Sequence, residues 1–270
     1  MFSRLALNDW RFWARLIVAA IFLLPLLWLL TAALHPVGRP LPTTLSPSLN
    51  VTLANFGRVW QLVPFGRFTL NSLLVVFLAV PLTLVTSSWA GFAMAQLPTA
   101  SQRRWIILSL AVLMVPGVAL WASRFLIYTR LGLYDTILAL IAPAFMGSSP
   151  FFVLMFYRAF RRIPVTIYEA ARLEGAGVLV SWRSIGLPIA RPTAVGVALL
   201  AFVLYWGDFI SPLLYLRSQN RYTLPVALQL LQQLAASDWP LLMAGVVMAT
   251  LIPVGLFLLL QPYLAKLGIS

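Results

Sequence analysis

Residues 169–177 read Glu-Ala-Ala-Arg-Leu-Glu-Gly-Ala-Gly, and residues 185–188 read Ile-Gly-Leu-Pro. Both runs lie in the longest charged interval of the chain, residues 158–192, which we call the charged loop. It separates two strongly apolar segments and holds six arginines and both glutamates of the protein. A basic interval between apolar segments is typical of a loop outside the membrane that connects two membrane spans. The charged loop therefore indicates where one span ends and the next begins.

The charged loop begins with the features of a short helix. Pro164 suits the first turn of a helix, because its missing amide proton has no partner there. Residues 165–173 can then form about two and a half turns. Glu169 and Arg172 are three residues apart and share a face of that helix.

A bend and a second helix complete the charged loop. Gly175 and Gly177 allow a turn where a residue with a side chain would be strained. Residues 178–185 can form a second short helix, and Pro188 and Pro192 mark the return to the next apolar segment. We therefore expect a compact helix–bend–helix with small residues at its top. These small residues are Ala170, Ala171 and Ala176.

Composition alone allows two interpretations of this loop: an ordinary basic loop of a membrane protein, or a docking surface for a soluble partner. The residue pattern favours the second, because it resembles the EAA loop of ABC-importer permeases. The matching positions are Glu169, Ala170, Ala171, Gly175, Leu187 and Pro188. The spacing follows the carbohydrate-importer branch through Pro192. Two residues depart from it: Glu174 replaces the usual aspartate and Trp182 the usual phenylalanine.

The composition of the whole chain points to a membrane protein. Of its 270 residues, 61% are hydrophobic and only 9% are charged, and the mean hydropathy is +0.94. A soluble domain of this size would need far more charge to cover its surface. The net charge of +13 could suggest nucleic acid, but the arginines are scattered between apolar segments and form no single basic face. We expect lipid around the chain and no nucleic-acid partner.

Six apolar segments are long enough to cross a bilayer, which takes about 20 residues. They are residues 16–34, 68–97, 105–123, 136–157, 193–216 and 239–265. The first is longer than the apolar core of a signal peptide, about 7–15 residues, so we expect a retained helix. The sequence thus predicts an all-α integral membrane protein with six transmembrane helices, in a single transmembrane domain over residues 1–270.

The basic residues predict the orientation. With the N-terminus inside, inner segments carry twelve of the 19 lysines and arginines, and outer segments carry seven. Because these residues are enriched in cytoplasmic loops, both termini and the charged loop are predicted to be cytoplasmic.

The chain offers little for catalysis. It has no cysteine and a single histidine, His35, which we expect to be solvated at the membrane interface. It contains no glycine-rich phosphate loop, no nucleophile with a plausible base, and no metal-ligand spacing. We predict no catalytic residue and no metal or cofactor bound by this chain.

Asp208 is the one acid inside a predicted span. Such an acid usually faces a cavity or a partner, because burying it in hydrocarbon costs roughly 2.5–3.5 kcal/mol. The sequence leaves two interpretations open: an interfacial acid paired with Arg217 or Arg124, or a residue that lines a substrate path.

Three further residues are candidates for the same path, and Asn71 is the weakest of them. Trp206 and Tyr205 offer aromatic faces that could stack on a sugar ring, but either could belong to the core. Asn71 could line a cavity, although an interhelical hydrogen bond is the more common use of such a residue.

The resemblance extends from about residue 55 onward, to the second permease subunit of maltose-type sugar importers. Supporting runs are Asn71-Ser72, residues 131–136 and residues 206–209. The C-terminal residues 267–270 depart from the family pattern, which puts a contact between the tail and an ATPase in doubt.

The resemblance implies a type I ABC importer permease in the cytoplasmic membrane of a bacterium or archaeon. It implies three partners: a second permease, a cytoplasmic ATPase dimer that uses ATP and Mg²⁺, and an external solute-binding protein. The charged loop would dock on the ATPase and act as a lever, through Glu169, Ala170, Ala171, Glu174, Gly175, Leu187 and Pro188. The implied cargo is a sugar or a related solute.

Two other functions stay open from the residues alone. An ion-coupled secondary transporter needs acids along its path and usually a repeated architecture, so one intramembrane acid and no visible repeat argue against it. A non-transporting membrane scaffold would be isolated without any ATPase.

Overall fold

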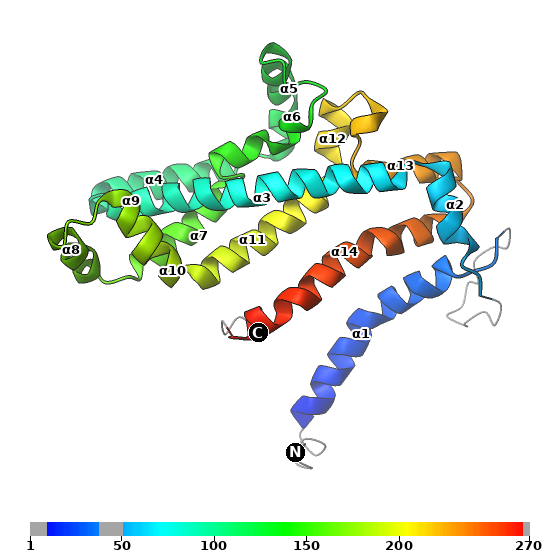
Figure 1. Cartoon of the computed structure of the whole chain (residues 1–270), viewed down its shortest axis with the longest axis horizontal. Coiled ribbons are helices and arrows are strands. Elements are labelled where there is room, and N and C mark those ends of the chain that lie inside the picture. Colours follow the sequence, from blue (N-terminus) through cyan, green and yellow to red (C-terminus); the bar gives the residue numbers. More distant parts are fainter. Residues whose placement is uncertain (1–9, 38–50, 267–270) are drawn as a thin grey trace. The chain divides into compact units, whose positions relative to one another are not determined.

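The computed structural model of the chain describes residues 10–37 and 51–266. Over these residues the ordered structure is helical, with no β-strand (Figure 1). The prediction about the C-terminal residues 267–270 lies outside this part of the chain. Two compact units divide the structure, one formed by residues up to Gly66 with Ala227–Phe257, the other by Arg67–Val226 with the C-terminal end. The single domain over residues 1–270 stays a prediction.

The first unit is built from long helices at the two ends of the chain. It contains α1 (Trp10–Ala33), α2 (Ala54–Leu62), most of α13 (Leu224–Leu234) and most of α14 (Trp239–Lys266). Gly245 lets α13 and α14 approach closely, because a Cβ atom there would lie only 3.0 Å from a methyl group of Leu231.

Polar side chains join the helices of this unit. The amide of Asn55, fully buried on α2, donates hydrogen bonds of 2.9 Å to the carbonyls of Ala33 and His35 at the end of α1. Arg58 on α2 forms an ion pair of 2.7 Å with Asp238 before α14. The expectation that His35 is solvated is wrong, because its side chain, just after α1, is buried.

The second unit contains one very long helix and a series of shorter ones. The long helix is α3 (Phe65–Gln96), which is continuous through Pro81. It is followed by α4 (Thr99–Leu113), η1 (Gly117–Leu120), α5 (Trp121–Arg130), α6 (Ile137–Ile141), η2 (Ala142–Met146) and α7 (Pro150–Arg161). Next come α8 (Val165–Leu173), α9 (Val178–Val180), a π-helix η3 (Ser181–Gly186), α10 (Leu187–Ile189) and α11 (Arg191–Trp206). Finally, α12 (Ile210–Tyr215) and η4 (Gln219–Arg221) precede α13.

One hydrophobic core of this unit forms where α3, α7, α8 and α11 pack together. A Cβ atom on Gly91 would lie 2.7 Å from both the Phe156 Cβ and the Tyr157 amide nitrogen, so only glycine allows this approach. Phe156 and Phe160 on α7 are almost completely buried beside it. The core therefore lies directly under the charged loop, which starts at the end of α7.

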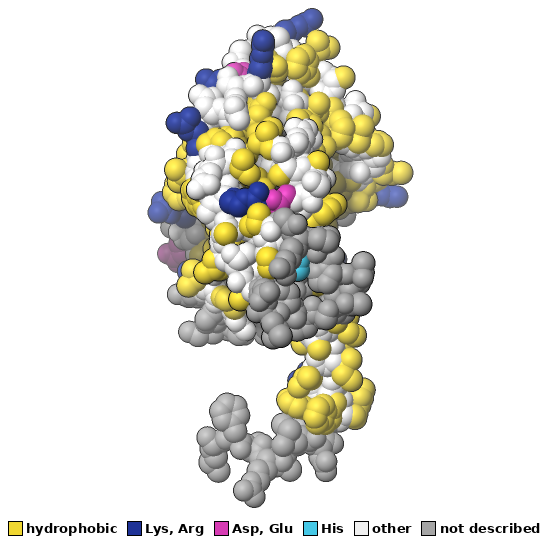
Figure 2. All heavy atoms as spheres, turned by 90° about the vertical axis from the view of Figure 1, so that its right-hand side faces the viewer, with side chains coloured by type: hydrophobic (Ala, Val, Ile, Leu, Met, Phe, Trp, Pro, Cys, Tyr) yellow, Lys and Arg dark blue, Asp and Glu magenta, His cyan; other side chains and the backbone are white. Residues whose placement is uncertain are grey.

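The described helices include four that are long and apolar enough to cross a membrane. They are Phe12–Ala33, Phe65–Gln96, Ile137–Arg161 and Trp239–Gln261, and they agree with four of the predicted spans. Two bent helix pairs raise the number to six if each pair is one span. Figure 2 shows apolar side chains scattered across the described part of the face in view, among polar side chains and backbone.

The two remaining predicted spans, residues 105–123 and 193–216, do not have the same bounds as the two bent helix pairs. Residues 105–123 do not form one straight helix, because α4 ends before Pro116 and the chain turns by 89° into η1 and α5. The segment 193–216 also ends early: α11 stops at Trp206, and α12 is a separate short helix. Its partner is instead the preceding helix Val178–Ile189, at an angle of 82°.

Candidate functional site

The first helix of the charged loop has the predicted bounds. The helix α8 runs from Val165 to Leu173, and Pro164 lies just before it at the N-cap position, one residue earlier than a first-turn proline. The carbonyl of Pro164 accepts the amide of Ile167 at 3.1 Å, which closes the first turn.

The end of α8 is fixed by a glycine. Gly175 has φ +82°, a left-handed conformation that favours glycine, whereas Gly177 has an ordinary φ of −71°. The Ala176 amide donates to the Ala171 carbonyl at 2.9 Å, and the Gly175 amide donates to the Arg172 carbonyl at 3.0 Å. This pair of bonds is the Schellman motif, which satisfies the last carbonyls of a helix. Of the two glycines, Gly175 makes the bend.

The second helix of the loop is longer than the predicted 178–185. It continues through α9, the π-helix η3 and α10 to Ile189. The widened π turn ends just before Pro188, which cannot donate a hydrogen bond back to the preceding turn. Leu187 and Pro188 are half-buried, and Leu187 packs on the α3–α7 core.

The acidic and small residues of α8 face outward. Glu169, Ala170 and Glu174 are exposed, and Ala171 is half-buried. Within the described residues, neither Glu169 nor Glu174 takes part in an ion pair or a side-chain hydrogen bond. Glu169 therefore does not pair with Arg172, whose guanidinium donates instead to Gln96 on α3 at 3.3 Å. The two carboxylates remain free to bind something else.

Aromatic rings hold the other face of the loop against α3. The Trp182 ring meets Trp89 edge-on with centroids 5.5 Å apart, and the Tyr168 ring meets Phe92 at 5.8 Å. Phe92 also contacts Phe160 of α7 at 5.4 Å. We call these five residues the aromatic clasp. It ties both helices of the loop to α3 and α7, so a force on α8 reaches both of these helices.

The clasp carries two polar groups without a partner. The Tyr168 hydroxyl and the Trp182 indole N–H are buried and have no hydrogen-bond partner among the described residues. Burial raises the pKa of the Tyr168 phenol, so this group stays protonated and acts as a donor at neutral pH.

The candidates for the substrate path have four different settings. The Asn71 amide donates 2.9 Å hydrogen bonds to the carbonyls of Asn220 and Tyr222, so it fastens the segment before α13 to α3. Trp206 is half-buried and stacks on Phe202 with ring centroids 5.7 Å apart. Both residues have a structural partner already.

Asp208 lies outside any helix, since α11 ends two residues before it. Its carboxylate accepts the Ser211 amide at 3.0 Å in the first turn of α12. Neither Arg217 nor Arg124 pairs with it in the part of the chain that is described. The interpretation as an acid paired with one of these arginines is therefore wrong.

Tyr205 belongs to a chain of hydroxyl groups that the sequence did not reveal. Its phenol exchanges a 2.7 Å hydrogen bond with Ser148, and Ser148 exchanges another with Thr83 of α3. Ser148 has φ +60° and follows Gly147 at φ +74°, in the break between η2 and α7. This break brings hydroxyls from three segments together, which no local pattern announces.

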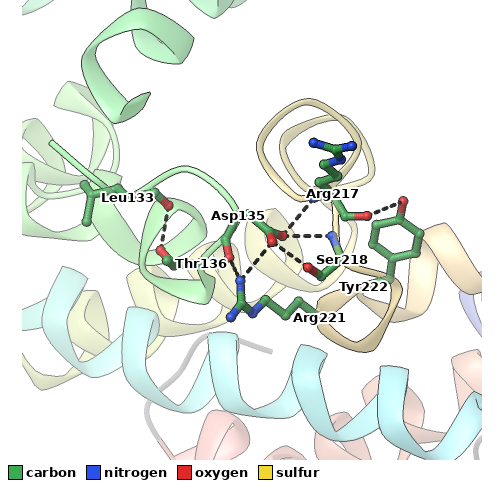
Figure 3. Close-up of polar contacts among 7 residues, drawn as sticks. All are labelled: Leu133, Asp135, Thr136, Arg217, Ser218, Arg221 and Tyr222. Atoms are coloured by element: carbon green, nitrogen blue, oxygen red, sulfur yellow. Dashed lines mark hydrogen bonds and ion pairs between the residues drawn. The ribbon is translucent and has the colours of Figure 1, made fainter. Parts of the chain in front are cut away.

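A second polar cluster was also missed. The carboxylate of Asp135 accepts the amides of Arg217 and Ser218 at 2.9 Å each, and the Ser218 hydroxyl (Figure 3). Arg221 pairs with the same carboxylate at 3.0 Å and also donates to the Asp135 carbonyl. We call these four residues the Asp135 network. In the sequence, only the run 131–136 drew attention to Asp135. That run did not indicate which residues Asp135 contacts.

The Asp135 network is electrostatically well satisfied. The hydrogen bond from the Ser218 hydroxyl is the largest of the effects that lower the pKa of Asp135 to about 2. The backbone amides and the Arg221 guanidinium act in the same direction. Asp135 itself has φ +57°, a strained value for a residue with a side chain, which the surrounding bonds hold in place.

The charged loop and the segment that carries Arg221 of the Asp135 network contact opposite ends of α3. Gln96, the last residue of α3, bonds Arg172, whereas Asn71 near its start bonds the segment that carries Arg221. These positions are separated by 25 residues, or about 38 Å of helix. Figure 1 shows α8 and α9 gathered at the end of α3 that leads into α4.

Comparisons with known proteins identify relatives along most of the chain. It is 30% identical to the sulfoquinovosyl glycerol transport system permease protein of Agrobacterium fabrum, over 93% of this chain and 88% of that protein. It is also 30% identical to the arabinooligosaccharides transport system permease protein of Halalkalibacterium halodurans, over 91% and 89%. The trehalose transport system permease protein of Mycobacterium tuberculosis is 29% identical, over 80% of each chain.

The fold also has solved counterparts. A bacterial ABC transporter involved in the import of the acidic polysaccharide alginate superposes with a TM-score of 0.75 and 20% identity, covering 98% of both chains. No model of a known protein family matches the sequence.

Proposed function

Since the chain belongs to the carbohydrate-importer family of ABC transporter permeases, we propose that it is one of two permeases in an importer of a sugar or related solute. Its relatives are named for trehalose, arabinooligosaccharides and a sulfosugar glycerol compound. A second permease would complete the path through the membrane, an ATPase dimer would supply energy, and a solute-binding protein would deliver the cargo.

The observation that carries the proposal is the state of two carboxylates, Glu169 on α8 and Glu174 at its C-cap. An exposed helix with unpaired Glu169 and Glu174 and small Ala170 and Ala171 can enter a cleft and still offer charge to a basic group there. The Schellman bend at Gly175 keeps α8 at a fixed angle. We therefore assign ATPase docking to these residues, with the half-buried Leu187 and Pro188 as the base of the loop.

The mechanism is a lever between the ATPase and the spans. When the ATPase dimer closes around ATP and Mg²⁺, α8 moves with it. The aromatic clasp passes that movement to α3 and α7, because packed rings transmit displacement while a loose loop would absorb it. Rocking of these helices would open the path alternately to the two sides of the membrane.

The proposed arrangement in the membrane has six spans and cytoplasmic termini. Two observations support it. Four helices are long and apolar enough to cross a membrane, and α4 and α11, one arm of each bent pair, would supply the other two spans. The charged loop and the Asp135 network lie at opposite ends of α3, as the positive-inside count requires for an inner and an outer loop.

We propose Tyr205 as the strongest candidate for the substrate path. Tyr205 and Thr83 are buried, and the half-buried Ser148 that joins them could exchange its hydrogen bonds for bonds to the hydroxyls of a sugar. Trp206 can present the ring face that is not stacked on Phe202. Asp208 and Asn71 shape the path from its edges, through α12 and the segment before α13.

Uptake and ATP hydrolysis by the reconstituted importer test the lever. Gly175→Pro forces φ to about −65° in place of a left-handed value. We expect it to abolish uptake while the chain still assembles in the membrane. Glu169→Lys reverses an exposed charge, and we expect it to separate hydrolysis stimulated by the solute-binding protein from uptake.

Gly177→Ala is the matched control, because Gly177 has an ordinary φ and a Cβ atom there meets nothing within 4 Å. It should transport normally. Normal hydrolysis and uptake in both Gly175→Pro and Glu169→Lys would refute the docking role.

A further inference from the structure

A cavity of about 550 Å³ lies between the end of α3 and the charged loop. Its α3 wall includes Trp89, Phe92 and Ala93, and its loop wall includes Val178, Leu179 and Trp182. The volume falls within the range of small-molecule sites, about 300–1,000 Å³. The lining is predominantly apolar, so the cavity suits a hydrocarbon chain better than a sugar or a nucleotide.

Polar groups are confined to a few positions of this cavity. Arg172 and Gln96 both line it, and their side chains are joined by the 3.3 Å hydrogen bond. Gln96 satisfies the guanidinium without neutralising it, since no carboxylate among the described residues pairs with Arg172. The cavity therefore combines an apolar wall with one uncompensated positive charge.

Two further donors stand in the wall. The Tyr168 hydroxyl and the Trp182 indole N–H belong to residues that line the cavity, and both lack a partner in the described chain. An oxygen acceptor that reached them would break no existing hydrogen bond. Leaving a buried donor unpaired is costly, so an occupant with an acceptor oxygen is favoured over a purely apolar one.

The position of the cavity selects among amphiphiles. Gln96 is the last residue of an apolar helix long enough to cross the membrane, and Trp89 lies two turns before it. Tryptophan and arginine at the end of a span are typical of the interface between hydrocarbon and headgroups. Basic pockets at the cytoplasmic side of transmembrane helices bind anionic lipid headgroups.

We propose that this cavity binds an anionic phospholipid of the cytoplasmic leaflet, with an acyl chain against Trp89 and Phe92 and the phosphate at Arg172. Such a lipid would fill the space beside the aromatic clasp and brace the charged loop against α3. The inference rests on the cytoplasmic placement of the charged loop under the proposed function. It adds a ligand that the docking role does not require.

A photocrosslinking experiment on the whole importer tests this site. Val178→p-benzoylphenylalanine puts a photoreactive group at the exposed side of the cavity, and vesicles contain phosphatidylcholine with phosphatidylglycerol. We expect crosslinks to phosphatidylglycerol in excess over its share of the lipid. Arg172→Gln should reduce that preference about fivefold, equivalent to ~1 kcal/mol, the contribution of one basic residue near a charged bilayer.

A filling variant and two controls complete the design. Ala93→Trp occupies the cavity from α3 and should remove the crosslink to lipid. Ala90→Trp adds the same bulk at an exposed α3 residue outside the cavity, and Arg104→Gln removes a charge from α4. Both controls should leave the crosslink unchanged.

Two results would overturn the proposal: equal crosslinking to both lipids that Arg172→Gln does not change, or a crosslink to the ATPase or second permease in place of lipid. Crosslinking does not depend on coupling. An importer with Glu169→Lys should therefore keep the lipid signal, and failure of the docking role can be told from failure of the lipid site.

Discussion

The two ends of α3 are held by opposite kinds of interaction. At the Gln96 end, the charged loop is fastened by the rings of the aromatic clasp, and its carboxylates Glu169 and Glu174 have no ion-pair partner within residues 10–37 and 51–266. At the Asn71 end, the Asp135 network pairs its carboxylate with two amides, a hydroxyl and a guanidinium. At the Asn71 end the carboxylate is paired with groups of the same chain, whereas at the Gln96 end the carboxylates are available to bind a partner.

This difference separates stability from binding. A carboxylate with all its partners inside the chain has little left to offer a ligand, and removing it exposes unsatisfied groups. An unpaired exposed carboxylate contributes little to the stability of the fold, and it can form an ion pair with a partner protein. The comparison therefore predicts that equivalent substitutions at the two ends will have unequal effects on stability.

The largest effect should come from Gly91→Ala, which attacks the support of the charged loop. The new methyl group would lie 2.7 Å from the backbone of Tyr157 and 2.8 Å from the Val153 carbonyl, neither of which can move alone. We expect a loss of about 1–3 kcal/mol, the cost of forcing extra bulk into a packed core. Thermal unfolding of the purified complex measures it. Gly57→Ala, where a Cβ atom meets nothing within 4 Å, is the control.

Next in size is Asp135→Asn, which keeps the shape and tolerates the left-handed conformation but removes the charge. We expect a loss of about 1–2 kcal/mol, because hydrogen bonds to a charged group contribute more than neutral ones. Unfolding of this variant should be compared with Asp208→Asn, which loses a single amide bond. Equal stability of the two variants would contradict the comparison.

Acid should weaken the same end of α3. The pKa of Asp135 is lowered to about 2 from 3.8, so its stabilising contribution is fully present above pH 4. That contribution is lost as the pH falls from about 4 toward 2, because the carboxyl of the unfolded chain takes up a proton at a higher pH than the native carboxylate does. The difference in stability between the native chain and Asp135→Asn should therefore shrink over this interval, and a constant difference would be inconsistent with it.

Gly175→Ala should cost about 1 kcal/mol, because a side chain in the left-handed region is strained. The same change at Gly177 should cost less, since its φ is ordinary. Unfolding of the two alanine variants side by side isolates the backbone effect. A larger loss at Gly177 would mean that the second glycine also bends the loop.

The smallest effect on stability should be that of Glu169→Gln, within about 0.5 kcal/mol of the native chain, as for an exposed site without partners. Its effect on uptake should nevertheless exceed that of Asp135→Asn at equal amounts of assembled importer. Uptake and unfolding measured on one preparation make this test. A clear loss of stability would show that Glu169 has an internal partner.

Local features of the fold could be predicted from the sequence. The bounds of α8 and the bend at Gly175 follow from a proline, a glycine and helix-forming residues within a dozen positions. Four spans follow from the length of apolar segments alone. The break near Pro116 could not be predicted, because neighbouring helices decide whether a proline inside a span interrupts its helix. The break after Trp206 could not be predicted from the length of the apolar segment either.

The two polar clusters, around Asp135 and around Ser148, could not be predicted from the sequence for a different reason. Asp135 meets Ser218 from 83 residues away, and Ser148 meets Tyr205 from 57 residues away. No periodicity links such positions, and a single sequence gives no record of their pairing. The free state of Glu169 was equally hidden, since Arg172 on the same face is engaged by Gln96.

The π-helix at Ser181–Gly186 has a consequence for how this chain can vary in length. A π turn contains one residue more than an α turn, so it acts as a one-residue insertion held inside a continuous helix. Deleting a single residue there would let the segment revert to α-helix while the rest of the loop and α11 keep their places. We expect the protein to tolerate the deletion of one residue within Ser181–Gly186. The deletion of one residue within α8 should instead disrupt the protein.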